Sequence, residues 1–282
     1  AQGGAELAGI PRITVAGTPH DHPFIGHAKS LAERRRRSCA GRRLMRTDQH
    51  APCPVIFDLD GTLIDSAPDI HAGVNRVLLA HGFEPLSFAQ IRSFIGRGVG
   101  HLMAQVVGAL GKDPAGPLTE ELLAAFEVEY EKAVDLTAPY PNMRAALTAL
   151  ISAGHPLAIC TNKPLRPTLA VLEHLALTDC FKTIIGGDSL PVKKPDPAPL
   201  LAALTEVENG TPALYVGDSE VDAATAQAAG MPFALYANGY RKTSVEDIKA
   251  TYGMAYVFED FAEFPQIVER FAARGMTAKT DA

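Results

Sequence analysis

The sequence predicts an α/β fold, a doubly wound and mostly parallel sheet with an inserted α-helical domain, and three observations support this prediction. Short apolar runs recur from residue 54 onward and alternate with amphipathic segments, as in strand–helix–strand units. The runs lack a two-residue alternation, which is typical of strands buried on both faces of a parallel sheet. The stretch 66–138 breaks the pattern, because it contains helical segments and no convincing strand.

Six strands are predicted from the apolar runs, and helices with recognisable ends lie between some of them. The strands are 55–57, 157–160, 183–185, 213–216, 233–236 and 256–258. Asn142 precedes a helix that is expected to stop at Gly154, and Ser219 is expected to cap another that stops at Gly230.

The stretch 66–138 is predicted to fold into helices. Ser87 and Gln90 fit a capping box, and Gly96 would close that short helix. Further helices are expected at 101–110, closed by a glycine, and at roughly 118–134.

We therefore predict three parts in the chain. Residues 53–66 and 139–276 would form the α/β core domain, and residues 67–138 an α-helical cap domain placed over the strand ends. Pro139-Tyr140-Pro141 is interpreted as a stiff linker back into the core.

The remaining part, residues 1–52, is predicted to be a disordered basic extension. The first 54 residues hold nine Lys or Arg against four Asp or Glu and show no helix or strand periodicity. An organelle transit peptide is an alternative, although serine is scarce, and Met45 would also make a sensible start. The role of this segment stays open.

Composition narrows the class of protein. The 282 residues are 47% hydrophobic and 21% charged, which is ordinary for a globular protein. The net charge of −6 argues against nucleic acid as a partner, and no apolar run approaches the ~20 residues of a membrane helix. The four cysteines form no CxxC pair, so reduced thiols and a cytoplasmic location are predicted.

Polar residues follow four consecutive apolar runs. They are Asp58, Thr161-Asn162-Lys163, Gly186-Gly187-Asp188 and Gly217-Asp218. Each of these residue types also terminates strands as a turn former, and for Asp188 that alternative is equally good. Ligands bind at the carboxyl ends of strands in open α/β sheets, so the sequence predicts a site at this edge.

The residues of this edge resemble a known family. Asp58-Leu59-Asp60-Gly61-Thr62, then Thr161, then Lys194-Pro195, and then Gly217-Asp218 with Asp222, are similar to the four motifs of the haloacid dehalogenase superfamily of phosphotransferases. The resemblance covers nearly all of residues 54–272, in order and spacing, and the helical stretch stands where the family has its C1-type cap. It implies a Rossmann-like core and phosphoryl transfer through an aspartyl-phosphate.

The resemblance and carboxylate chemistry together assign roles to the acidic residues. Asp58 is expected to be the nucleophile toward phosphorus. Asp58 and Asp218 fit as side-chain ligands of Mg²⁺, and the resemblance implies that Asp60 adds its backbone carbonyl. Asp60 resembles the family's general acid/base, a residue that the dehalogenases lack. Asp222 resembles a group that holds metal-bound water.

The neutral and basic residues would bind the phosphoryl group. Thr161 and the amides near Asn162 are expected to hydrogen-bond its oxygens, and Lys194 to offset its developing charge. The alternative is that Lys194 is an ordinary solvated lysine. The position of Lys194 directly before Pro195 favours this residue over Lys193 for the phosphoryl-binding role.

The substrate prediction rests on a narrower resemblance. The segments 185–191, 193–197, 161–164 and 94–98 resemble bacterial phosphoglycolate phosphatases, which implies hydrolysis of 2-phosphoglycolate to glycolate and phosphate. Arg97 would pair with the substrate carboxylate, or else is a surface arginine between two glycines.

Other functions stay open. A β-phosphoglucomutase, another sugar or nucleotide phosphatase of the same superfamily, and a receiver-like phosphoacceptor module are the alternatives considered. A small phosphate ester is the expected partner, without nucleic acid or membrane, and the chain is expected to be a monomer or homodimer.

Overall fold

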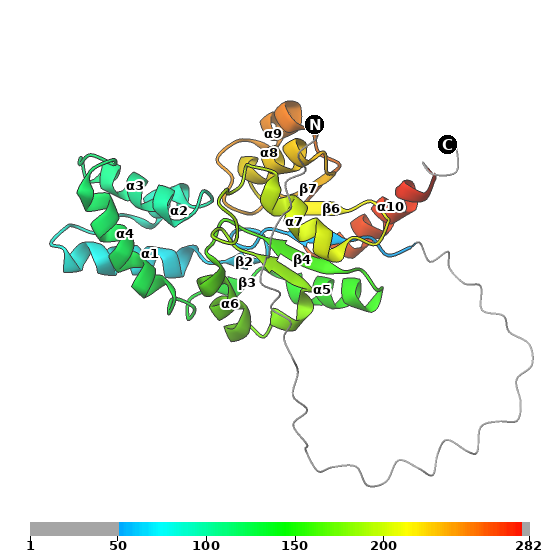
Figure 1. Cartoon of the computed structure of the whole chain (residues 1–282), viewed down its shortest axis with the longest axis horizontal. Helices are drawn as coiled ribbons and strands as arrows, with labels where there is room; N and C mark the ends of the chain where they lie inside the picture. Colours follow the sequence, from blue (N-terminus) through cyan, green and yellow to red (C-terminus); the bar gives the residue numbers. More distant parts are fainter. Residues whose placement is uncertain (1–50, 278–282) are drawn as a thin grey trace, which may run out of the picture. The chain divides into compact units, whose positions relative to one another are not determined.

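The computed structural model describes residues 51–277 and is built on a six-stranded sheet (Figure 1). Its order is β5-β4-β1-β6-β7-β8, and every neighbouring pair is parallel. The strands are β1 (Val55–Phe57), β4 (Leu157–Cys160), β5 (Thr183–Ile185), β6 (Leu214–Gly217), β7 (Phe233–Tyr236) and β8 (Tyr256–Phe258). The predicted fold class is confirmed, and only β6 differs from its predicted bounds, by one residue.

Winding in two directions puts an apolar layer on each face of this sheet. The chain runs from β1 to β4 and β5 in one direction, then crosses to β6, β7 and β8 on the other side of β1. Val55 and Phe57 of β1 lie in one hydrophobic cluster, and Ile56 lies in another. This alternation along one strand is what a sheet covered on both faces requires.

The helices of the two layers come from different stretches of the chain. One cluster contains residues of α5 (Met143–Ser152), α6 (Leu165–His174) and α10 (Phe264–Thr277). The other contains residues of α7 (Ala198–Val207), α8 (Glu220–Ala229) and α9 (Val245–Tyr252). A short 3₁₀ helix, Thr178–Cys180, precedes β5.

The predicted helix ends of this domain are largely confirmed. Ser219 caps α8, and Gly230 ends it in the left-handed conformation. Asn142 does precede α5, but it makes no capping bond with its side chain, and the helix ends at Ser152, two residues before Gly154.

Four helices between residues 67 and 130 form what we call the helical insertion. They are α1 (Ala67–Ala80), α2 (Phe88–Phe94), α3 (Val99–Ala109) and α4 (Pro117–Tyr130). The capping box of Ser87 and Gln90 is confirmed, whereas α3 begins two residues earlier than predicted and α4 ends four residues earlier.

The insertion has a hydrophobic cluster of its own, separate from the two that cover the sheet. Ile70, Leu102, Leu122 and Phe126 are among its buried members. A self-contained core of this kind is what a small domain needs. The boundaries 67 and 138, and the role of a cap, stay predictions.

The segment that leads back to the sheet, interpreted from the sequence as a stiff linker, begins with a short strand. Ala138–Pro139 forms strand β3, which pairs antiparallel with β2, Ile64–Asp65. The two chain crossings between sheet and insertion are therefore hydrogen-bonded to each other. Strands of two residues carry no periodic pattern, so the sequence could not indicate this pair.

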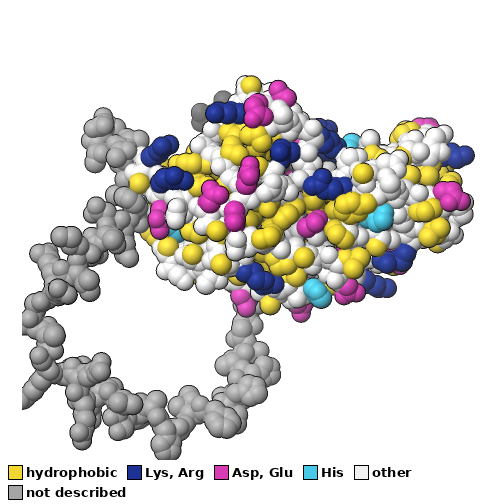
Figure 2. Space-filling model, turned by 180° about the vertical axis from the view of Figure 1, so that it is seen from behind, with side chains coloured by type: hydrophobic (Ala, Val, Ile, Leu, Met, Phe, Trp, Pro, Cys, Tyr) yellow, Lys and Arg dark blue, Asp and Glu magenta, His cyan; other side chains and the backbone are white. Residues whose placement is uncertain are grey.

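Acidic and basic side chains are interspersed on the face shown in Figure 2, which has no continuous basic surface. Within residues 51–277 no helix has the length and apolar character to cross a membrane. The predicted basic extension falls almost entirely on residues 1–50, which lie outside the described residues.

A pair of leucines tests the packing of the insertion. Leu122 of α4 is fully buried, whereas Leu79 of α1 is 61% exposed. We expect Leu122→Ala to lower the free energy of unfolding by about 2–5 kcal/mol, because it leaves a cavity. Leu79→Ala is the matched control and should change it by about 0.5 kcal/mol or less. Denaturant titrations followed by circular dichroism measure both; equal losses would contradict a packed core in the insertion.

Candidate active site

The predicted site residues gather at the carboxyl ends of β1, β4 and β6. Asp58 follows β1, Thr161 follows β4, and Asp218 follows β6. The backbone N–H of Asp58 donates to the carbonyl of Val216 at 2.8 Å, so the ends of β1 and β6 are held together. The winding direction of the sheet changes between these two strands, which is where ligands bind in such folds.

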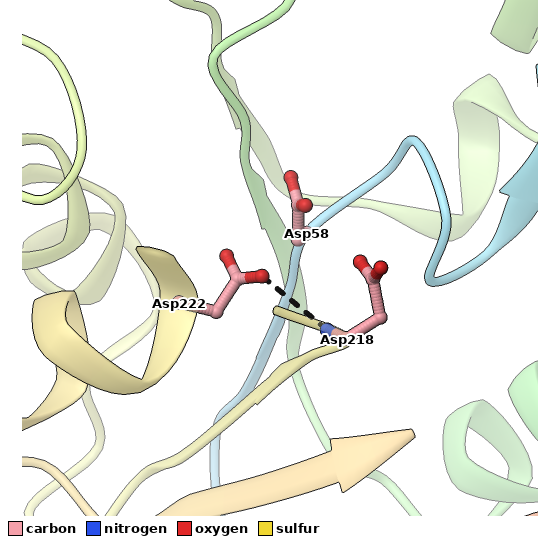
Figure 3. Close-up of side chains that lie close together, drawn as sticks. All are labelled: Asp58, Asp218 and Asp222. Atoms are coloured by element: carbon pink, nitrogen blue, oxygen red, sulfur yellow. Dashed lines mark hydrogen bonds between the residues drawn. The ribbon is translucent and has the colours of Figure 1, made fainter. Parts of the chain in front are cut away.

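Three buried carboxylates converge there and form what we call the carboxylate cluster. It consists of Asp58, Asp218 and Asp222, and one oxygen of each lies within 4.8 Å of the others (Figure 3). Burial, and then the charge of Asp222 against the attraction of Lys194, raises the pKa of Asp58 to about 7. Burial and the charges of Asp222 and Asp58 raise the pKa of Asp218 well above its ordinary value. The cluster therefore holds more negative charge than its surroundings compensate.

Lys194 is the cation that contacts this cluster. Its Nζ lies 2.8 Å from Oδ1 of Asp58 and 2.7 Å from Oδ1 of Asp222, and it donates to the hydroxyl of Tyr215 at 2.9 Å. Burial lowers the pKa of Lys194, but the two carboxylates outweigh burial and raise it. Burial would raise the pKa of Asp222, yet Lys194 and the hydrogen bonds of Ser219 and Tyr215 lower it. Of the three carboxylates, Asp222 is thus the one whose negative charge Lys194 compensates most fully.

Asp222 is placed by the start of helix α8. Its Oδ2 accepts hydrogen bonds from the Ser219 hydroxyl at 2.6 Å and from the Ser219 N–H at 3.1 Å. Its Oδ1 accepts from the Tyr215 hydroxyl at 2.8 Å. The capping box that begins α8 therefore also positions a residue of the carboxylate cluster.

Asp218 is held by donors from two loops. The Thr62 hydroxyl donates to its Oδ1 at 2.9 Å, and the N–H of Tyr240 donates to its Oδ2 at 2.5 Å. Both loops approach so closely that only glycine fits beside the carboxylate. A Cβ at Gly61 would lie 2.6 Å from Oδ2, and a Cβ at Gly239 would overlap the Asp218 side chain.

Asp60 contacts a different lysine, Lys163. Its Oδ1 accepts a hydrogen bond from the Ser66 hydroxyl at 2.6 Å and lies 3.5 Å from Nζ of Lys163. Lys163 donates to the hydroxyl of Tyr130, from α4, and lies 3.9 Å above the centre of that ring. Burial lowers the pKa of Lys163, and Asp60 and Asp69 offset part of this effect.

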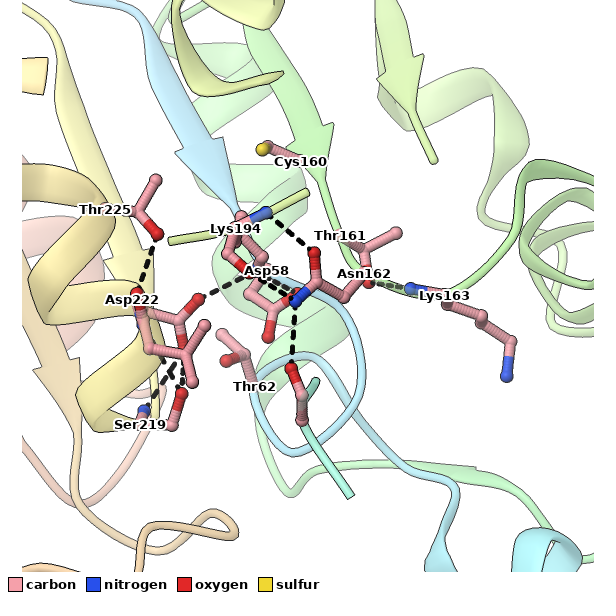
Figure 4. Close-up of polar contacts among 12 residues, drawn as sticks. Asp58, Thr62, Cys160, Thr161, Asn162, Lys163, Lys194, Ser219, Asp222 and Thr225 are labelled. Atoms are coloured by element: carbon pink, nitrogen blue, oxygen red, sulfur yellow. Dashed lines mark hydrogen bonds and ion pairs between the residues drawn. The ribbon is translucent and has the colours of Figure 1, made fainter. Parts of the chain in front are cut away.

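The two predicted phosphate-binding residues that follow β4, Thr161 and Asn162, also organise the loops around them (Figure 4). The Asn162 side chain donates to the carbonyl of Lys194 at 3.0 Å and accepts from the Lys194 N–H at 3.0 Å. The same amide donates to the carbonyl of Gly96 in the insertion at 3.1 Å. Thr161 Oγ1 accepts from the N–H of Lys163 at 3.2 Å.

Two cavities meet at Asp58 and Asp60. The first spans about 400 Å³ with the adjoining open solvent included, and is lined by Thr161, Asn162 and Lys163 together with apolar residues of the insertion. The second, about 360 Å³ with its open solvent included, is lined by Asp218 and by the exposed Arg97. The structure thus brings every predicted site residue except Arg97 to the first cavity or to the carboxylate cluster beside it.

The carboxylate cluster has the properties of a site for a hard cation. Asp58 Oδ1 is buried and accepts no hydrogen bond from the described residues, although it faces the ammonium group of Lys194. Lys194 contacts two of the three carboxylates, and every candidate metal-ligand atom of the cluster is an oxygen. These residues fit a divalent ion that prefers oxygen ligands.

Comparison with known proteins identifies the family. Residues 55–236 match the family model described as haloacid dehalogenase-like hydrolase. The chain belongs to the haloacid dehalogenase-like hydrolases. The predicted family and the prediction of a hydrolytic enzyme are thereby confirmed.

Relatives of this hydrolase carry a more specific name. A phosphoglycolate phosphatase of Rhodobacter capsulatus is 48% identical over 215 residues, covering 76% of this chain and 96% of the relative. One from Rhodospirillum rubrum is 41% identical over 229 residues, covering 76% and 92%. A crystal structure described as a predicted phosphoglycolate phosphatase, from Haemophilus somnus, matches with a TM-score of 0.70 at 28% identity, covering 78% of this chain and 99% of the other.

The sequence prediction missed several residues of this hydrolase site. Lys163 was noted as a polar residue after a strand but received no role; its position two residues after Thr161 was the available signal. Tyr130, Tyr240 and Gly239 come from the insertion or from the loop after β7, and nothing local marks them.

A glycine exchange tests the close approach beside Asp218. Gly239→Ala should lower the free energy of unfolding by about 1–3 kcal/mol, because the added methyl overlaps the Asp218 side chain. Gly100→Ala in α3 is the control, since a Cβ there meets no atom within 4 Å, and it should stabilise the helix by up to about 1 kcal/mol. Both values come from denaturant titrations. A Gly239→Ala protein as stable as the wild type would refute the described geometry.

Proposed function

We propose that this hydrolase is a Mg²⁺-dependent phosphatase that converts 2-phosphoglycolate to glycolate and phosphate. The observation that carries the proposal is the state of Asp58. This residue follows β1, its carboxylate borders the first cavity, and its buried Oδ1 lies 2.8 Å from Nζ of Lys194 and accepts no hydrogen bond from the described residues. The names of relatives that are 40–50% identical support the choice of ester.

The first half of the reaction forms an aspartyl-phosphate. A carboxylate oxygen of Asp58 attacks phosphorus, the bond from phosphorus to the ester oxygen breaks, and Asp60 gives that oxygen a proton. Glycolate is then the leaving product. Lys194 stays beside Asp58 and offsets negative charge on the phosphoryl group, with Thr161 and the amides near Asn162 as further donors.

The second half returns the enzyme to its starting state. Asp60, now a carboxylate, takes a proton from water while the water oxygen attacks phosphorus. The bond between phosphorus and Asp58 breaks, and phosphate leaves. The Ser66 hydroxyl, which donates to Asp60 at 2.6 Å, holds this carboxyl group toward the cavity in both halves.

Mg²⁺ would be held by Asp58 and Asp218, with the backbone carbonyl of Asp60, and would supply the positive charge that lets an anionic ester approach these carboxylates. Asp222 would not ligate the ion itself, but would hold Lys194 and metal-bound water.

The helical insertion would act as a cap, with residues 67–138 as the cap domain and residues 53–66 and 139–276 as the core. Two hydrogen bonds support this role. Arg92 of α2 donates to the carbonyl of Gly239 at 2.7 Å, and Asn162 donates to the carbonyl of Gly96. The insertion thereby closes over the first cavity and keeps bulk water from the acyl-phosphate. A cytoplasmic location and a monomer or homodimer stay predictions.

A panel of small phosphate esters tests the proposed substrate. The value of kcat/KM for 2-phosphoglycolate should exceed that for glucose 1-phosphate and for other sugar or nucleotide phosphates by roughly tenfold or more. Phosphate release is measured with Mg²⁺ present, and Asp58→Asn serves as the inactive control. A different ester at the head of the panel would refute the choice of substrate while leaving the phosphatase itself intact.

Exchange of Asp60 tests the acid/base role. Asp60→Asn should lower kcat for 2-phosphoglycolate by about 10²–10⁴-fold, because the amide neither donates nor takes the required proton. Asp179→Asn, at an exposed position of the 3₁₀ helix, is the matched control and should keep the wild-type rate. An unchanged rate for Asp60→Asn would remove the role.

Removal of metal tests the cation. Treatment with EDTA should abolish phosphate release, because the carboxylate cluster then repels the anionic ester, and added Mg²⁺ should restore the rate. Activity that does not respond to chelation would contradict the proposed cofactor.

A further inference from the structure

The first cavity is lined by a buried lysine for which the proposed reaction has no use. Lys163 is 5% exposed, and among the described residues that line this cavity its side chain is the only cationic one. Figure 4 shows the side chains of Lys194 and Lys163 well apart, with Lys194 beside Asp222 and Lys163 at the end of the Thr161–Lys163 segment. The site therefore presents positive charge at two separate places.

The two lysines differ in how well protein groups compensate them. Lys194 has carboxylates at 2.7 Å and 2.8 Å and a tyrosine hydroxyl as partners. Lys163 has the Tyr130 hydroxyl, the face of the same ring, and one carboxylate at 3.5 Å. An ammonium group carries three donor hydrogens, so Lys163 keeps the capacity to bind a further anion from the cavity.

The position of Lys163 relative to Asp60 indicates which anion would fit. In the proposed mechanism Asp60 protonates the ester oxygen that leaves. In 2-phosphoglycolate a single methylene joins this oxygen to a carboxylate. Lys163 Nζ lies 3.5 Å from Asp60 Oδ1. A carboxylate attached one carbon beyond the leaving oxygen would therefore come within reach of the Lys163 ammonium group.

The remaining walls of the cavity suit a short substrate. Ile70, Val99 and Leu102 of the insertion are apolar, and the ring of Tyr130 contacts the lysine. A hydroxylated sugar would leave polar groups unpaired against these walls, whereas a methylene would not. Two separated positive charges and apolar cavity walls match a small molecule with two anionic ends.

We infer that Lys163, held by Tyr130, is the specificity-determining residue that binds the carboxylate of the substrate. This inference rests on the proposed function and deepens it. Lys163 thus takes the place that the sequence suggested for Arg97, which is exposed and lines the second cavity rather than the first.

Two phosphonates measure this role without turnover. In 3-phosphonopropionate a methylene replaces the ester oxygen of 2-phosphoglycolate, and in propylphosphonate a methyl group additionally replaces the carboxylate. Their affinities for the full chain with Mg²⁺ are measured by calorimetry. The wild type should bind the carboxylated compound about 10- to 100-fold more tightly, as expected for one charged hydrogen-bonded pair.

Lys163→Met should remove this preference to within about threefold and leave the affinity for propylphosphonate unchanged. Lys163→Arg keeps the charge and should keep most of the preference. Lys182→Gln, at an exposed lysine before β5, is the control and should match the wild type. Thermal unfolding verifies that each protein is folded, and Lys163→Gln replaces the methionine variant if that variant does not fold.

The outcomes separate the inference from the proposed function. A Lys163→Met protein that keeps the preference, or that loses affinity for both phosphonates equally, would overturn the role of Lys163, the second result indicating a role through Asp60 instead. A wild type that hydrolyses other esters but shows no preference for the carboxylated phosphonate would overturn the proposed substrate and the inference together.

Discussion

The contact of Lys194 with two of the three buried carboxylates is the interaction on which the rest of the site depends. Buried charge of one sign costs free energy unless cations or donors meet it. Here one ammonium group contacts Asp58 and Asp222, while Asp218 accepts hydrogen bonds from a hydroxyl and a backbone N–H within residues 51–277. The carboxylate cluster therefore keeps uncompensated negative charge, which favours binding of a cation. For the same reason the carboxylate of Asp58 is available to attack phosphorus.

The fold explains why these groups meet although they are far apart in sequence. Asp58 follows β1 and Asp218 follows β6, and the two strands lie side by side where the winding of the sheet reverses. Lys194 reaches them from the loop after β5, which Asn162 holds through two hydrogen bonds. Asn162 also contacts the insertion at Gly96, so the loop that carries the lysine and the helices above the cavity share one anchor.

The sequence was sufficient for the sheet and for the motif residues. Apolar runs of three or four residues marked five of the six strands with their observed bounds, because strands buried on both faces exclude polar residues throughout. The pair of β2 and β3, the contact of Lys163 with Tyr130, and the approach of Gly239 to Asp218 were not predictable. Each joins segments whose local patterns are unremarkable, and only the folded chain brings them together.

The position of the metal ion is the most direct test of the central claim, and Mn²⁺ in place of Mg²⁺ makes that position visible. Crystals of the full chain grown with Mn²⁺ would give an anomalous difference peak at each bound ion. We expect one peak at the site, contacted by carboxylate oxygens of Asp58 and Asp218, with Lys194 still paired to Asp222. A peak that involves Asp222 with Lys194 displaced, or no peak beside Asp58, would contradict this account.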